Sequence, residues 1–151
     1  MFEGKVISIN ITPVAEAPLD SVEEVRAIPG RGLEGDRYFD HADKLPKREL
    51  TLVEAEAIEA FRSEFKIDFS MDGTRRNIVT RGVPLNHLVG KDFWIGDVKA
   101  RGLQLCEPCA TLQRLSHPKV LPGLLHRGGL RAQILTEGTI RVGAVISEAR
   151  P

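Results

Sequence analysis

The chain contains no long apolar run, and this absence excludes a membrane-spanning helix. None of its hydrophobic stretches comes near the roughly 18 consecutive apolar residues that such a helix needs. The N-terminal stretch MFEGKVISIN also lacks the basic start and apolar centre of a secretory signal peptide. We therefore expect a cytoplasmic protein that has no membrane partner.

Cysteine is scarce, and Cys106 and Cys109 are the only two in 151 residues. A structural disulfide is uncommon in the cytoplasm, where close cysteines more often bind a metal or take part in catalysis. A zinc site requires about three or four ligands, and His117 and His126 do not have the usual histidine spacing. A redox dithiol typically caps a helix in a β-α-β unit, which the pattern around the cysteines does not suggest. A single reactive thiol fits better, and zinc and dithiol chemistry stay as alternatives.

Net charge is also absent, since 21 Lys and Arg balance 21 Asp and Glu, and aromatic residues make up only 5% of the chain. Neither feature suits a nucleic-acid partner, which requires basic surfaces and stacking side chains. The charges are nevertheless unevenly placed. Residues 1–73 contain nine basic and sixteen acidic side chains, whereas residues 74–131 contain ten and three. The basic stretch includes both cysteines, which favours an anionic ligand there; alternatively, the two halves pack together and neutralise each other.

The length and composition predict a single domain, residues 1–151, with 42% hydrophobic residues. A chain of this size buries about 70% of the surface that it exposes when unfolded, so one core is sufficient without disulfides. The sequence shows no internal repeat, low-complexity tract or linker.

Short strands separated by turns dominate the expected secondary structure. Alternating β-branched residues predict a strand at 4–12, and residues 22–28 form a second strand or the start of a helix. A long ordered loop rich in glycine, proline and charge follows at 29–49. The stretch LTLVEAEAIEAFRSEF begins as a strand and becomes a helix from about Val53, with an apolar face and early glutamates.

The second half of the chain continues this pattern. RRNIVT predicts a short strand, PLNHLVG a helical turn closed by Gly90, and DFWIGDVKARGLQL two strands joined near Gly96. After the cysteines, ATLQRLS and PKVLPGLLHR predict a helix and a second, broken helix. We expect the last strands to form a hairpin that turns at Glu137-Gly138. The result is a mainly β fold, a closed or strongly bent antiparallel β-barrel with a few helices.

Cys109 is the candidate reactive group. It lies between the apolar strand that contains LQL and the helix predicted for ATLQRL, and therefore near a helix N-terminus. The partial positive charge of that terminus and the local excess of arginine favour the thiolate form. Such a thiolate could attack sulfur, carry a persulfide or bind a soft metal. Cys106 has a simpler interpretation as a buried apolar side chain.

Three clusters of glycine and arginine could surround an anion. In PGRGLEGDRYF, the residues Gly35, Asp36 and Arg37 form either a phosphate-binding turn or a tight turn held by an internal Asp36–arginine pair. In HRGGLRAQIL, Arg127 and Arg131 flank a glycine turn.

The third cluster is GTRRNIVTRG. Strand alternation sends Arg75 and Asn77 to one face and Arg76 to the other, so that one arginine reaches a ligand while the other stays in solvent. Alternatively, these arginines cover the acidic first half of the chain.

Taken together, these motifs resemble a stand-alone bacterial MOSC domain, a name taken from the C-terminal domain of eukaryotic molybdenum-cofactor sulfurase. The resemblance runs from about Lys5 to Ile146 and rests on GLEGDRY, RELTLVEAEAIEAF, RRNIVTRGVPLNHLVGKDFWIGDV, CEPC and HRGGLRAQIL followed by GTIRVGAVI. It implies a strand-rich β-barrel. It also implies that the protein binds a molybdenum cofactor, a molybdopterin, or handles sulfur for it, through a cysteine that corresponds to Cys109. The Arg-x-Asn-Ile stretch of the family corresponds to Arg75, Asn77 and Ile78.

Relatives in this family suggest two activities. Some reduce N-hydroxylated substrates at the molybdenum, and others are fused to a desulfurase that uses pyridoxal phosphate. Because this chain is too short to include that desulfurase, we expect pyridoxal phosphate only on a partner desulfurase. Electrons or sulfur would come from another protein, either an electron donor or a cysteine desulfurase. Cys109 is thus expected as catalytic residue and metal ligand, or as a sulfur carrier through a persulfide. The expected binding residues for the anionic pterin cofactor are Gly35, Asp36, Arg37, Arg75, Asn77, Arg127 and Arg131. A binding module without a metal of its own, or a structural zinc-binding barrel, is the alternative.

Overall fold

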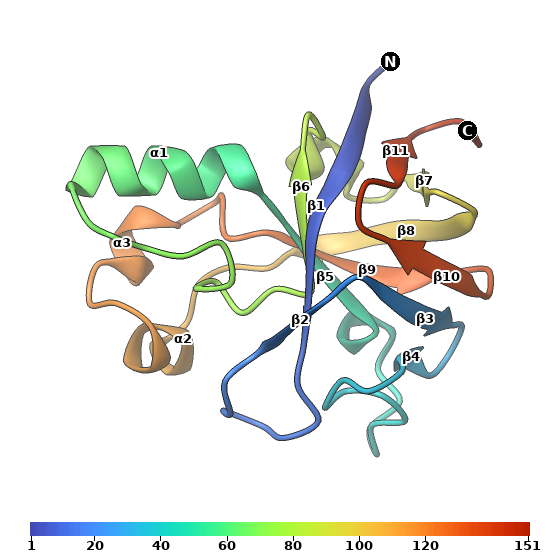
Figure 1. Ribbon diagram of the computed structural model, residues 1–151, viewed down its shortest axis with the longest axis horizontal. Helices are drawn as coiled ribbons and strands as arrows, with labels where there is room; N and C mark the ends of the chain where they lie inside the picture. Colours follow the sequence, from blue (N-terminus) through green and yellow to red (C-terminus); the bar gives the residue numbers. More distant parts are fainter.

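Seven strands close into a barrel in the computed structural model, which describes residues 1–151 (Figure 1). Around the barrel they follow one another as β11 (Val145–Ser147), β7 (Asp92–Ile95), β8 (Val98–Leu105), β9 (Leu130–Ile134), β5 (Leu50–Glu54), β6 (Ile78–Arg81) and β1 (Glu3–Ile11). Antiparallel pairing of β1 with β11 closes the ring. The mainly β, closed-barrel class expected from the sequence is confirmed.

The remaining elements lie outside the ring. The strand β2 (Asp20–Val22) pairs with β1, and a separate three-stranded sheet contains β10 (Gly138–Arg141), β3 (Glu24–Ile28) and β4 (Gly32–Leu33) in that order. The helices are α1 (Ala55–Phe65), α2 (Ala110–Leu115) and α3 (Val120–Gly123), with single 3-10 turns at Pro46–Arg48 and Leu85–Leu88. All three helices lie on one side of the barrel, on the left in Figure 1.

Alternation along the strands fills the barrel interior with apolar side chains. In β9, for example, Leu130, Ala132 and Ile134 are buried, whereas Arg131 and Gln133 face outward. Twenty buried residues from the strands and their connections form this interior cluster. The same alternation leaves the outward-facing residue of a strand, such as Arg131, available to a site on the outside of the barrel.

One pair of strands differs from the antiparallel arrangement expected from the sequence. β5 and β6 run parallel, because the eleven-residue helix α1 carries the chain back before β6 begins. Both faces of this pair are covered: Ile78 points into the barrel, and Val79 packs under α1 in a second cluster of nine buried residues. The barrel is therefore mixed, and its parallel pair has a core on each side.

The prediction of a hairpin at the C-terminal end is wrong. β9 pairs with β5 on one edge and β8 on the other, so no edge of β9 is open to β10. β10 pairs instead with β3 in the separate sheet, at a register that places Gly138 opposite Ala27. Turn residues at 137–138 indicate a change of direction but do not determine which strand comes next to β10.

No helix of this protein reaches the length and apolar character required to cross a bilayer.

Candidate functional site

The two cysteines have different surroundings although only two residues separate them. Cys106 is 1% exposed, and its backbone N–H donates to the Gly129 carbonyl at 2.7 Å just beyond the end of β8. Cys109 is exposed and is the N-cap of α2, where its Sγ accepts from the Leu112 N–H at 3.5 Å. The sequence-based positions are confirmed: Cys106 is a buried side chain, and Cys109 begins a helix.

Cys109 faces a cavity of about 160 Å³ that is rich in arginine. Its lining includes Arg37, Arg75, Arg76 and Arg131, which come from three separate parts of the chain. The other lining residues are Ala15 and Glu16 from the loop before β2, Tyr38, and Thr111, Leu112 and Leu115 of α2. The lining thus combines a thiol, four guanidinium groups and a single carboxylate.

Most arginines of the basic stretch, residues 74–131, are neutralised within the protein. Arg81 pairs with Glu59, Arg101 with Asp92, Arg114 with Glu16, and Arg127 with Glu64. The other three, Arg75, Arg76 and Arg131, form no ion pair, and all three line the cavity beside Cys109. Packing of acidic on basic segments therefore accounts for part of the charge asymmetry, and the unpaired part is concentrated at the thiol.

The position of Arg76 differs from the prediction. Alternation placed Arg76 on the face opposite Arg75, but β6 begins only at Ile78, so strand geometry does not apply to either arginine. Arg75 has a left-handed backbone, with a φ of 61°, and its N–H donates to the Asp72 carbonyl at 2.9 Å. This turn brings both guanidinium groups to one cavity. The pair Asp72-Gly73 indicates a turn, but nothing in the local sequence predicts the left-handed backbone of Arg75.

Backbone carbonyls hold the cavity arginines in place. Arg75 Nη2 donates to the Ala17 carbonyl at 2.7 Å, and Arg131 Nη1 donates to the Lys47 carbonyl at 3.4 Å. Burial lowers the pKa of Arg75, and repulsion from Arg37 lowers it further. The cationic forms are thus crowded and partly removed from water, which favours the entry of an anion.

The turn that contains Arg37 contributes to the wall of the site. Asp36 is buried, accepts from the Thr12 N–H at 3.2 Å, and lies 3.4 Å from Arg37 Nη1. Gly35 precedes it with a φ of 89°, a conformation that suits glycine. The Asp36–Arg37 contact agrees with the tight-turn alternative. Arg37 lines the cavity, whereas Asp36 and Gly35 are not part of the lining.

Asn77 and Arg127 lie away from the cavity lining. Asn77 is buried, and its amide joins two strands: Oδ1 accepts from Thr51 N–H and Oγ1, and Nδ2 donates to the Asn10 carbonyl. Arg127 pairs with Glu64 on the surface. Of the expected binding residues, Arg37, Arg75 and Arg131 come together at Cys109, whereas Asn77 and Arg127 are engaged elsewhere.

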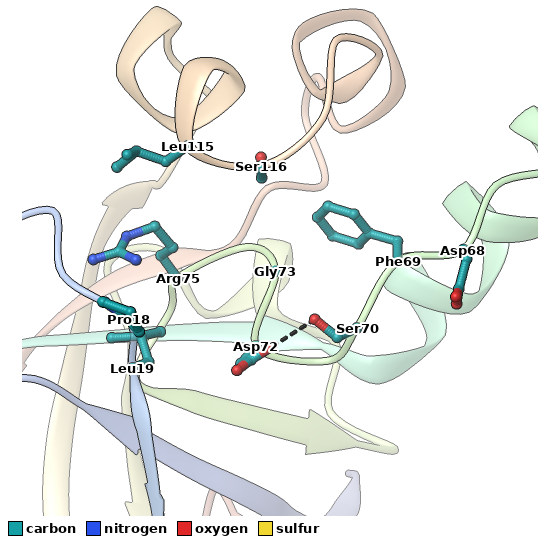
Figure 2. A pocket seen from close by; sticks show the side chains of 10 residues that line it. All are labelled: Pro18, Leu19, Asp68, Phe69, Ser70, Asp72, Gly73, Arg75, Leu115 and Ser116. Atoms are coloured by element: carbon teal, nitrogen blue, oxygen red, sulfur yellow. Dashed lines mark hydrogen bonds between the residues drawn. The ribbon is translucent and has the colours of Figure 1, made fainter.

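A second cavity of about 350 Å³, drawn in Figure 2, shares lining residues with the first. Arg75 and Leu115 line both cavities and form their common wall. Phe69, Asp68 and Asp72 also line the second cavity, and Figure 2 shows the hydrogen bond from Ser70 to Asp72. The two cavities thus provide an arginine-rich compartment and a carboxylate-containing compartment side by side.

The protein has no group of three or more His, Cys, Asp or Glu side chains placed to hold a metal ion. The zinc alternative therefore finds no full ligand set in this chain. A metal held here by protein would need ligands from a cofactor in addition to Cys109.

The structure is a closed, mainly β barrel with one exposed thiol beside an arginine-lined cavity. The chain belongs to the MOSC domain family, whose model matches residues 40–147. The match excludes Glu16 and Arg37, so part of the cavity wall is contributed by residues outside the matched segment.

Solved structures confirm the fold. The YuaD protein from Bacillus subtilis superposes with a TM-score of 0.80 at 15% identity, over 97% of both chains. YiiM from Geobacillus stearothermophilus has a TM-score of 0.72 at 18% identity, over 97% of this chain and 75% of that one. YiiM from Escherichia coli has a TM-score of 0.72 at 19% identity, over 97% and 70%. No curated protein matches the chain in sequence.

Proposed function

We propose that this protein binds a molybdenum cofactor beside Cys109 and acts in oxidoreduction or sulfur transfer through that thiol. The observation that carries the proposal is the concentration of the unpaired arginines, Arg75, Arg76 and Arg131, around the exposed thiol in one cavity. A phosphate suits such a set, because guanidinium groups bind it through charge-assisted hydrogen bonds. A thiolate suits a soft metal centre.

The two adjoining cavities fit the parts of a pterin cofactor. The arginine-lined cavity, at about 160 Å³, is smaller than the roughly 300–1,000 Å³ of most ligand pockets and suits an anionic group alone. The second cavity, at about 350 Å³, has room for a ring system. Its carboxylates, Asp68 and Asp72, would accept hydrogen bonds from the amino and ring N–H groups of a pterin. Arg75, in the common wall, would contact both parts.

The protein's own residues would then have distinct tasks. Arg37, Arg75 and Arg131 would hold the anionic group, and Cys109 would supply a thiolate ligand. When bound, the molybdenum would supply two-electron redox chemistry. An electron donor, or a desulfurase with pyridoxal phosphate, would be a separate protein.

A second candidate function is sulfur carriage without a metal, which the contrast between exposed Cys109 and buried Cys106 favours. The Cys109 thiolate would attack the outer sulfur of a persulfide on the desulfurase. The sulfur–sulfur bond of the donor breaks, the donor thiolate leaves, and Cys109 becomes a persulfide, with no net oxidation. Only an accessible thiolate can perform this step.

One set of variants tests both functions. Wild type, Cys109→Ser and the matched control Cys106→Ala are produced in cells that make molybdenum cofactor, and bound molybdenum and pterin are measured. We expect both in wild type and Cys106→Ala, and loss of molybdenum in Cys109→Ser. Separately, each protein is incubated with a cysteine desulfurase and its mass is determined.

The outcomes separate the two functions. Wild type without molybdenum or pterin, but with one added sulfur on Cys109, supports the sulfur carrier and rejects the cofactor. Neither cofactor nor sulfur, or equal sulfur labelling of the two cysteines in wild type, contradicts the role of Cys109 altogether.

A further inference from the structure

Arg76 is the most deeply buried cation of the site, and it connects two loops. Arg76 as a whole residue is 9% exposed. Nε donates to the Gly128 carbonyl at 2.8 Å, and Nη2 donates to the Cys106 carbonyl at 2.9 Å and to the Glu107 carbonyl at 3.3 Å. One guanidinium thus joins the turn at residues 126–129 to the segment 106–109, which we call the cysteine loop.

One nitrogen of Arg76 is left over. Nη1 donates to no atom of the protein. It is also not one of the buried side-chain atoms that lack a hydrogen-bond partner, which are Ser8 Oγ and Asn10 Nδ2 alone. Nη1 therefore reaches open space, and the cavity with Cys109 is the open space that Arg76 lines. The guanidinium therefore presents a free donor to the cavity while its other nitrogens are bonded.

The charge of Arg76 is also uncompensated. No carboxylate pairs with it, and only carbonyl dipoles surround it, although a buried charge normally requires a counter-ion. Burial lowers the pKa of Arg76, and the negative forms of Cys106 and Cys109 act in the opposite direction. The missing counter-charge can be supplied by an anion bound in the cavity that Arg76 lines.

We propose that Arg76 is a positioning residue that fixes the cysteine loop and, through Nη1, selects a phosphate-like oxoanion next to Cys109. The inference deepens the proposed function, from which it takes Cys109 as the working thiol and the cavity as its anion site. An oxoanion offers several acceptor atoms to Nη1 and to the neighbouring guanidinium groups of Arg37 and Arg131. A lysine cannot hold three carbonyls and still present a donor in the same geometry.

Protection of Cys109 from alkylation tests this assignment without any molybdenum. Iodoacetamide labelling of Cys109 is followed by peptide mass spectrometry at one pH, as a function of inorganic phosphate concentration. The variants are Arg76→Met and Arg76→Lys, and the control is Arg101→Met, an exposed arginine that pairs with Asp92. Thermal unfolding of each variant shows whether it is folded.

We expect phosphate to protect wild type and Arg101→Met alike. Both Arg76 variants should need about tenfold more phosphate, since one charge-assisted hydrogen bond contributes about that factor. Arg76→Lys should not recover the phosphate protection of wild type, because the lysine restores charge but not the fork. If Arg76→Met does not fold, Arg76→Lys carries the test.

A folded Arg76 variant with the phosphate protection of wild type would overturn the assignment. So would an absence of protection in wild type. These results are independent of the proposed function, because molybdenum and pterin in the purified protein are measured separately. If the protein contains the cofactor but the Arg76 variants keep the phosphate protection of wild type, only this inference is rejected.

Discussion

At the residue scale, neighbouring side chains of one kind serve different purposes. Cys106 and Cys109 form a Cys-x-x-Cys motif in sequence, but Cys106 is sealed in the protein and Cys109 is accessible. Arg75 and Arg76 are adjacent, and their backbone carbonyl partners lie in three separate segments of the chain. The chemistry of the site therefore depends on what each side chain contacts, more than on the motif to which it belongs.

A buried carboxyl group gives a prediction about pH. Glu49 is buried, and its Oε1 accepts from the Gly30 N–H at 3.3 Å and the Ile134 N–H at 3.1 Å. Burial raises the pKa of Glu49 although these bonds act against it. A raised pKa in the folded state means that the protonated form stabilises the protein at low pH, and that this contribution is lost as the pH rises through the folded pKa.

Glu49→Gln should therefore become more stable than wild type as the pH rises. The glutamine can keep both hydrogen bonds through Oε1 without a buried charge. We expect the melting temperature of the variant minus that of wild type to increase from acidic to neutral pH, as measured by circular dichroism.

Glu59→Gln is the matched control, for which we expect the opposite change of stability with pH. The exposed Glu59 pairs with Arg81, whose hydrogen bond lowers the pKa of Glu59, so any contribution is present at neutral pH and fades in acid. If both variants showed the same trend with pH, the role assigned to the burial of Glu49 would be wrong.

At the scale of elements, the site depends on two loops that touch through glycine. A Cβ added at Gly128 would lie 2.7 Å from the Cys106 carbonyl oxygen and 3.0 Å from Pro108 Cδ. The turn at 126–129 can therefore approach the cysteine loop only because residue 128 lacks a side chain. Arg76 binds the carbonyls of both loops across this contact.

Gly128→Ala should displace the cysteine loop. We expect a loss of about 1–3 kcal/mol in the free energy of unfolding, because the added methyl group meets backbone that cannot move freely. The rate of Cys109 alkylation should also change, since the start of α2 moves with the loop. Urea unfolding and peptide mass spectrometry measure the two effects.

Gly138→Ala provides the comparison. Its added Cβ would lie 2.9 Å from a methyl group of Val98, and this contact involves neither cysteine. It should lower stability without altering Cys109 alkylation. An unchanged alkylation rate in Gly128→Ala would show that the cysteine loop does not depend on this packing.

At the scale of the whole molecule, the candidate site lies away from the strand pair β1–β11 that closes the barrel, which we call the seam. The pairing of β1 with β11 closes the ring beside β7, while α2 lies on the opposite side of the molecule (Figure 1). Ile146 on β11 is fully buried in the barrel interior. A destabilising substitution at the seam should therefore lower the stability of the protein without changing the candidate site.

Ile146→Ala should lower the free energy of unfolding by about 2–5 kcal/mol, through lost burial and the cavity that remains. The control Val142→Ala, at an exposed position, should have little effect. Below the unfolding transition, phosphate protection of Cys109 should be the same in Ile146→Ala as in wild type. A parallel loss of protection would mean that the seam and the site are coupled.

Much of the fold could be predicted from local patterns. The strands near residues 4–12 and 22–28, the helix after Val53 and the helix that begins after Cys109 all follow from periodicity and turn residues, which depend on close neighbours in sequence. The wrong hairpin and the unexpected parallel pair are both errors of strand pairing. Pairing depends on edges that other strands have already occupied, and alternation within one strand contains no information about them.

The candidate site divides in the same way. The sequence by itself determined a mainly β domain, a family resemblance, a thiol at a helix start and an excess of arginine around it. Only the tertiary structure decided which arginines face that thiol: Arg76 is drawn inward by carbonyls of residues 106, 107 and 128, while Arg127 is taken by Glu64. Side-chain direction outside regular strands depends on hydrogen-bond partners that are distant in the chain, and such partners exist only once the chain has folded.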